Sequence, residues 1–367
     1  MHLNCGYGIG FSSPCLSQLV KEEFFSQENS SWFASTLVVG QIFGSLLGPV
    51  LADRVGRRKT CAIGAFFSII GWAVLGLGSA EWMLFAGRAI TGFFDCLSSP
   101  VAIMYVSEVS ETKLKGSFLN SSTVASGLGI ALAYFTGTVF YWRYACAFPI
   151  VFNFMSLFLF SFCPESPVFL LTQDGPALQS LQWYRETREA SKENDLETEG
   201  ELKDLESDTS SFGQGFKESL KKLLQGPNLK PFLILVVLFC LYPLTGMYSI
   251  AFFAIDLFKK LNLGSAETVA IISALMRCLG TSLSSFLIFK YGRRKIMLVG
   301  TTLVCLTIGL VGMFVILKEG NFGINETMIS WILIILIFIF MFCVGVSIAN
   351  MPWVLMGKIE YILYIYF

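Results

Sequence analysis

Charge and histidine are both scarce in this chain. Charged residues make up 14% of its 367 residues, against about 25% in soluble proteins, and 54% of the residues are hydrophobic. The 26 basic side chains are balanced by 26 acidic ones, so no positive field favours nucleic acid. His2 is the single histidine, and the ten cysteines include no C-x-x-C pair. These shortages leave little room for histidine-based catalysis or for a metal centre.

The sequence also has no nucleophile–histidine arrangement, no phosphate-binding loop and no cluster of metal-binding residues. We therefore predict that the chain is not an enzyme, with no catalytic residue, no metal and no cofactor. Nucleic acid and an obligate protein partner are not expected either.

Long apolar segments are what the chain has in abundance. A helix that spans a bilayer needs about 20 mostly apolar residues, and ten segments approach this pattern. They lie at 5–20, 31–52, 60–79, 83–106, 117–138, 144–162, 231–256, 266–288, 295–316 and 328–357. Six precede a polar, charged stretch at 169–229 and four follow it, which predicts an all-α membrane protein in the lipid bilayer, with a solvated and helical linker.

A basic motif divides the chain into two matching halves. The segment DRVGRRK at residues 53–59 recurs 236 residues later (289 − 53) as FKYGRRK at 289–295, each time between two apolar segments. Placing both turns in the cytoplasm also places most loop Lys and Arg there, as the positive-inside rule requires. The acceptor tripeptides for N-glycosylation at Asn29 and Asn325 then lie outside. The repeat predicts a duplicated transporter.

Glycine and proline recur at matching places in the two halves, at 6–14 and 242–248, and again at 92–100 and 345–352. Transporter helices break at such places, where freed backbone groups can bind a substrate. We therefore expect broken helices there, although glycine and proline are also generally frequent in membrane helices.

Several motifs carry a resemblance to a known family. They include DRVGRR at 53–58, GR at 87–88, YVSEV at 105–109, PESP at 164–167, GRR at 292–294 and PWVLMG at 352–357. On these the chain resembles the sugar porters of the major facilitator superfamily, and among them the facilitated trehalose transporters. The resemblance implies two six-helix bundles, a central sugar site and rocking of one bundle against the other, in a multi-pass protein of the plasma membrane.

The same resemblance implies the domain boundaries. The expected parts are a first bundle at 1–168 with a clipped first helix, a cytoplasmic linker at 169–229, and an incomplete second bundle of four helices at 230–367. About ten of the twelve helices are therefore expected, as in a fragment of a longer chain or in a degenerate copy.

Charged residues at the inner ends are expected to form a gate, since a network need only bias a small free-energy difference between two states. The residues implied for this gate are Asp53, Arg54, Arg57, Arg58, Arg88, Glu108, Lys115, Glu165, Arg293 and Arg294. A reading in which these charges only set the topology stays open.

The sugar site is where the chain departs from the family. The residues implied for substrate binding are Thr123, Tyr242, Tyr248, Arg277, Asn350 and Trp353. The family's QQLSGxN is here YPLTGMY at 242–248, so three amides that would hold sugar hydroxyls are missing, and Arg277 stands at an Asn position. Facilitated transport of trehalose or a hexose is the leading prediction. An organic-anion transporter using Arg277, or a sugar-porter-like membrane protein that does not transport, are the alternatives.

Overall fold

The computed structural model describes residues 1–22, 27–110, 115–173, 175–185, 226–260, 266–319, 326–350 and 352, and within these ranges the regular elements are all helices. The first part of the chain forms α1 (His2–Lys21), α2 (Gln27–Val55), α3 (Arg57–Leu77), α4 (Glu81–Val109), α5 (Lys115–Val139), α6 (Trp142–Ala145), α7 (Ala147–Phe162), α8 (Pro167–Thr172) and α9 (Ala177–Arg185). The second part forms α12 (Gly226–Leu244), α13 (Met247–Lys260), α14 (Ala266–Tyr291), α15 (Arg293–Glu319) and α16 (Glu326–Val346).

Most of these helices have the length and composition of membrane spans. In the described part of the chain, nine helical segments are long and apolar enough to cross a membrane, with α6–α7 and α12–α13 each counted as one segment. The tenth predicted span corresponds to α1, which is largely buried and carries Asn4, Ser12 and Ser13 in its interior. Each predicted span overlaps a helix or a pair of helices, although α16 ends at Val346 and most of 351–357 lies outside the described residues, and the all-α membrane class is confirmed.

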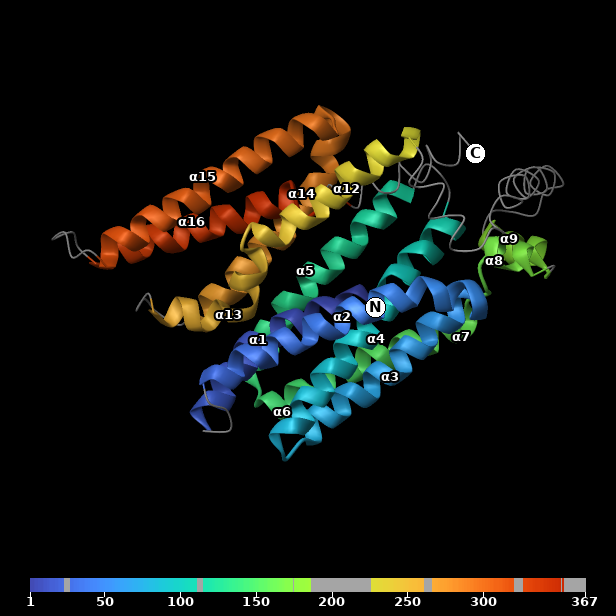
Figure 1. Cartoon of the computed structure of the whole chain (residues 1–367), viewed down its shortest axis with the longest axis horizontal. Helices are drawn as coiled ribbons and strands as arrows, with labels where there is room; N and C mark the ends of the chain where they lie inside the picture. Colours follow the sequence, from blue (N-terminus) through green and yellow to red (C-terminus); the bar gives the residue numbers. More distant parts are fainter. Residues whose placement is uncertain are drawn as a thin grey trace.

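The helices form two groups that follow the chain. Helices α1–α7 occupy the lower part of Figure 1 and α12–α16 the upper part, with α5 lying beside α14 between them. Within the first group α2 and α3 pack on α4 and α1 packs on α5, and within the second α14 and α15 pack on α16. The turn between α2 and α3 and the turn between α14 and α15 lie toward the same end of the molecule in Figure 1, which we call the basic-turn end.

Glycines set the close approach of equivalent helix pairs. A Cβ atom at Gly44 of α2 would collide with the main chain of α4, and one at Gly280 of α14 would collide with the main chain of α16. The two glycines are 236 residues apart (280 − 44), the same spacing as the basic turns (292 − 56). Because small residues let helix backbones approach in a membrane, the packing of α2 on α4 and of α14 on α16 is a structural repeat.

The expected helix breaks occur in one half only. The second half breaks between α12 and α13, where Gly246 has a φ of 82°, a conformation that favours glycine. In the first half α1 stays helical through Pro14, and α4 stays helical through Pro100, so the predicted breaks there were wrong. The reason in α1 is its packing on α5, since a Cβ at Gly6 or Gly10 would collide with the α5 main chain and this contact holds the helix.

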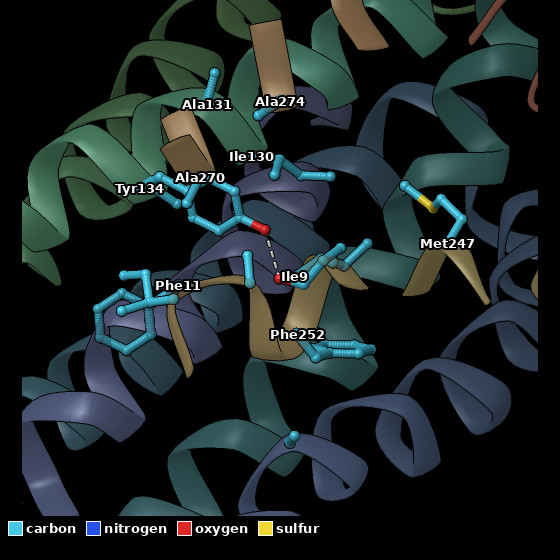
Figure 2. Packing of buried hydrophobic residues seen from close by; sticks show 14 of the residues in the cluster. Ile9, Phe11, Ile130, Ala131, Tyr134, Met247, Phe252, Ala270 and Ala274 are labelled. Atoms are coloured by element: carbon cyan, nitrogen blue, oxygen red, sulfur yellow. Dashed lines mark hydrogen bonds between the residues drawn. The ribbon is translucent and has the colours of Figure 1, made fainter. Parts of the chain in front are cut away.

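One hydrophobic cluster joins the two halves. Figure 2 shows Ile9 and Phe11 of α1 near Tyr134 of α5 and Phe252 of α13. Outside this core many large apolar side chains remain exposed, among them Phe154 (58%) on α7 and Val299 (62%) on α15. Exposed apolar faces of this extent suit helices surrounded by lipid.

Candidate functional site

A cavity of about 320 Å³ lies between the two groups of helices. Helices α1, α2, α4 and α5 contribute one side of its wall, and α12, α13 and α14 contribute the other. The lining residues are His2, Cys5, Ile9, Gln41, Ser45, Cys96, Ser99, Pro100, Ile103, Ser122, Thr123, Ser126, Phe239, Tyr242, Pro243, Tyr248, Arg277 and Ala349. The cavity is therefore built jointly by both halves of the chain.

Contacts between the halves flank this cavity along α5. Toward the basic-turn end, Asn120 Nδ2 donates to the Thr281 carbonyl at 3.5 Å. Toward the opposite end, Tyr134 Oη donates to the Ala251 carbonyl at 2.6 Å (Figure 2), and the Ile255 N–H donates to Ser13 Oγ at 2.9 Å. The two contacts on α5 are 14 residues apart (134 − 120), or about 21 Å along a helix. The two halves therefore contact each other on both sides of the cavity, and the space between these contacts can hold a small ligand.

Four of the residues predicted to bind substrate line the cavity: Thr123, Tyr242, Tyr248 and Arg277. Asn350 lies just behind the wall, fully buried, and its Oδ1 accepts a hydrogen bond from Thr123 Oγ1 at 3.1 Å. Trp353 lies outside the described residues.

Aromatic and cationic side chains line the part of the cavity wall that the second half contributes. The rings of Tyr242 and Tyr248 meet edge to face at 5.4 Å between centroids. Arg277 is only 6% exposed, and its Nε and Nη1 atoms are buried without a hydrogen-bond partner among the described residues. Aromatic faces and polar donors together are typical of a small-molecule pocket.

Sequence reasoning missed the lining residues on the first helices. His2 Nδ1 lies 2.9 Å from Ser99 Oγ, and Gln41 Nε2 lies 3.9 Å from Cys5 Sγ. Gln41 carried a usable signal, because it precedes Arg277 by 236 residues (277 − 41), the spacing of the basic turns. His2 and Ser99 carried none, because a polar residue in an apolar helix does not reveal which neighbour it faces.

Arg88 lies inside the first group of helices and away from the cavity wall. It is fully buried, donates to the Gly8 carbonyl at 2.8 Å and to Ser12 Oγ, and stacks on the ring of Phe33 at 4.6 Å. Its partners in the described part of the chain are therefore neutral dipoles and a ring rather than an ion pair. A cation–π contact and two hydrogen bonds hold α4 against α1 and α2.

A charged network closes the basic-turn end of the first group. Arg57, 3% exposed, lies 3.2 Å from Glu108 Oε1 through Nε and 3.2 Å from Asp53 Oδ1 through Nη1. The other oxygen of Glu108 accepts a hydrogen bond from Ser166 Oγ. This network ties the ends of α2, α3 and α4 to the segment that follows α7.

Glu165 joins this network through the main chain. Its Oε1 accepts the N–H of Arg58 at 2.8 Å, while the Arg58 guanidinium donates to the Ser161 carbonyl at 3.2 Å. Gly56, with a φ of 108°, makes the turn that brings this N–H to the carboxylate. Arg54 is exposed, and the side chain of Lys115 lies outside the described part.

The second basic turn has a different environment. Arg294 is exposed, and Arg293 Nη1 is buried without a partner among the described residues. The sequence has Phe289 where the first turn has Asp53, so the acid that would pair with an arginine is replaced. The two turns share a backbone shape, with positive φ at both glycines, but they differ in charge pairing.

Short helices α8 and α9 dock on the same end of the first group. Tyr184 Oη of α9 donates to the Pro164 carbonyl at 3.3 Å and contacts Tyr105 Oη, and Arg185 Nη1 donates to the Val109 carbonyl at 3.2 Å. Burial raises the pKa of Tyr184 to about 12, so the phenol stays neutral at physiological pH and can donate its proton. The start of the predicted linker is therefore fixed to the network.

Of the two predicted glycosylation sites, Asn325 lies outside the described residues. Asn29 lies in the first turn of α2, and its Nδ2 donates to Glu81 Oε1 at 2.5 Å. A glycan on Asn29 would require this hydrogen bond to break.

Two helical groups that enclose a shared cavity, in a chain of membrane-crossing helices, have the architecture of a membrane transporter. The family model "Sugar (and other) transporter" matches residues 3–361, and the chain belongs to this family. This membership confirms the predicted resemblance, and it supports the prediction of a transporter rather than an enzyme.

Similar proteins agree with this assignment. The solute carrier family 2 facilitated glucose transporter member 8 of Bos taurus is 26% identical over 326 residues, covering 87% of this chain and 65% of that protein. The facilitated trehalose transporter Tret1 of Anopheles gambiae is 25% identical over 366 residues, covering 96% of this chain and 44% of that protein. This chain therefore spans only part of the length of these relatives.

A solved structure shares the fold. The proton:xylose symporter XylE bound to 6-bromo-6-deoxy-D-glucose superposes with a TM-score of 0.76 at 19% identity, covering 97% of this chain and 80% of that one. The major facilitator fold predicted from the sequence is confirmed.

Proposed function

We propose that the chain carries a sugar, a hexose or trehalose, across a membrane by facilitated transport. The observation that carries the proposal is the cavity between the two halves, in a member of the sugar transporter family. The cycle needs no covalent step, because rocking of one half against the other would open the cavity alternately to each side.

The size of the cavity and the hydroxyl groups in its largely apolar wall support a small sugar as the cargo. Its volume of about 320 Å³ is at the lower end of ligand pockets, which span about 300–1,000 Å³, so a hexose fits more readily than a disaccharide. Hydroxyl groups of Thr123, Ser122 and Tyr248 can exchange hydrogen bonds with a sugar, and the Tyr242 ring can stack against it.

The contacts between the halves support alternating access. Opening toward the basic turns would break the Asn120–Thr281 contact, and opening away from them would break the Ser13–Ile255 and Tyr134–Ala251 contacts. We propose that residues 1–168 and 230–367 move as the two bodies. The network around Arg57 lies within the first of these bodies, so it would hold the inner end of that body together as the bodies move.

We propose the plasma membrane as the location. The acceptor tripeptides at Asn29 and Asn325, on the predicted outer side, support a membrane reached by secretion. Surface biotinylation of intact cells tests this proposal, and a chain retained entirely in internal membranes would contradict it.

Uptake into proteoliposomes tests the transport itself. The full chain should take up labelled glucose or trehalose saturably, and unlabelled sugar should compete. Ser126→Trp, which fills the cavity, should reduce uptake at least about tenfold. Leu128 lies two residues further along α5, outside the cavity lining, and is 43% exposed. Leu128→Trp should therefore leave uptake near the level of the unmodified chain.

The results distinguish sugar transport through the cavity from the alternative functions. Equal loss in both tryptophan variants would argue against the cavity as the path. Sugar binding without flux, in a chain shown to be inserted, would favour a sugar-porter-like protein that does not transport.

A further inference from the structure

The central cavity contains a cation without a counter-charge. Arg277 projects from α14 into the wall, is 6% exposed, and makes no ion pair within the described residues. Its Nε and Nη1 are buried without a hydrogen-bond partner there. Burying a guanidinium without partners costs free energy unless a ligand supplies a negative charge and hydrogen-bond acceptors.

The rest of the wall does not supply that charge. None of the lining residues that the structure describes is Asp or Glu. Asp95, a buried carboxylate of α4, is not one of the lining residues, and its Oδ1 accepts a hydrogen bond from Ser68 Oγ at 2.7 Å. Among the lining residues that the structure describes, the fixed charge is therefore that of Arg277.

Neighbouring groups add hydrogen-bond donors. Tyr242 Oη donates to the weak acceptor Met247 Sδ at 3.4 Å, and it also forms a side-chain hydrogen bond with Tyr248. Asn350 Oδ1 accepts a hydrogen bond from Thr123, and its buried Nδ2 has no partner among the residues that the structure describes. Hydrogen-bond donors that lack strong acceptors among the described residues therefore lie on the side of the cavity that the second half forms.

We propose that the preferred cargo is a monosaccharide that bears a carboxylate, a sugar acid, and that Arg277 binds this carboxylate. The inference rests on the proposed function and names the substrate class of the same cavity. A planar guanidinium matches a carboxylate in geometry, and the pair neutralises both charges in a site shielded from water. The sugar hydroxyls then meet Thr123 and the two tyrosines.

One unit of charge also favours a carboxylate over a phosphate ester. A phosphate group carries about −1.5 to −2 charges at pH 7. Arg277 would balance only one of them, and no second Lys or Arg lines the cavity among the described residues.

Competing uptake of two sugars tests the proposal. Proteoliposomes holding the full chain should take up labelled D-glucuronate with a kcat/KM at least about tenfold above that for D-glucose, or about 1.4 kcal/mol. Arg277→Gln should lower this ratio at least about tenfold, and Arg277→Lys should restore part of it. Lys290→Gln removes an exposed cation from the same helix and should leave the ratio unchanged.

Each result of this experiment supports or contradicts one of the two proposals. Uptake of glucose with no preference for glucuronate would overturn the inference and leave sugar transport standing. A preference that survives Arg277→Gln would remove Arg277 from the site. Uptake of neither sugar by an inserted chain would count against the proposed function itself. The preference of the unmodified chain is measurable even if a variant fails to fold.

Discussion

The pairing of Arg57 with Glu108 gives the sharpest test of the network at the basic-turn end. Arg57 has two carboxylate partners at the same distance of 3.2 Å, but their surroundings differ. The side chain of Glu108 is 12% exposed and that of Asp53 is 65% exposed. Removing one partner of a buried pair costs about 3–5 kcal/mol, because the other charge stays buried. An exposed pair contributes about 0–1 kcal/mol.

Glu108→Gln should therefore lower the free energy of unfolding by about 3 kcal/mol, the lower end of that range, since Arg57 keeps Asp53 and the Ala52 carbonyl as partners. Asp53→Asn, the matched control on the same arginine, should cost less than about 1 kcal/mol. Denaturant unfolding in detergent micelles measures both values. A double-mutant cycle with Arg57→Gln isolates the coupling in each pair.

Equal losses for the two variants would refute this reasoning, because burial would then not decide the strength of the pair. Coupling between Arg57 and Asp53 larger than that between Arg57 and Glu108 would refute it as well.

Three further substitutions test the packing and the transport cycle. Gly280→Ala should lower the free energy of unfolding by about 1–3 kcal/mol, because its methyl group meets the α16 main chain, whereas Gly312→Ala on α15, with open space around it, should not. Gly246→Ala should slow uptake severalfold without preventing insertion, since a φ of 82° costs other residues about 1–3 kcal/mol. Ser13→Ala should leave a buried N–H of α13 unpaired, at about 1–3 kcal/mol, and open the end opposite the basic turns. Faster maleimide labelling of Cys15, in a variant with no other cysteine, measures that opening.

Much of the fold follows from sequence patterns because the membrane restricts the choices. The lengths of the apolar segments predict the membrane-spanning helices. The basic turns, which repeat after 236 residues, indicate which parts of the two halves are equivalent. Thr123, Tyr242, Tyr248 and Arg277 could be placed in the site because the resemblance fixes their positions along the helices. His2 could not, since its role depends on which helix packs beside the start of α1.

Packing and backbone geometry explain the remaining differences. Pro14 suggested a break, but glycine contacts with α5 keep α1 helical. Charge patterns suggested an ion pair for Glu165, whereas the turn at Gly56 offers it the N–H of Arg58. A sequence shows which charges exist, but main-chain donors become visible only when the turn is known.

The burial of α1 has a consequence for how the chain enters a bilayer. Its polar and small residues face α5 and the interior, so on its own this segment would expose hydrogen-bonding side chains to hydrocarbon. The neighbour that covers it, α5, begins only at Lys115 and therefore emerges from the ribosome well after α1. Stable insertion of α1 thus depends on a helix that is made later, and the first group of helices is complete in the bilayer only when α5 has been synthesised.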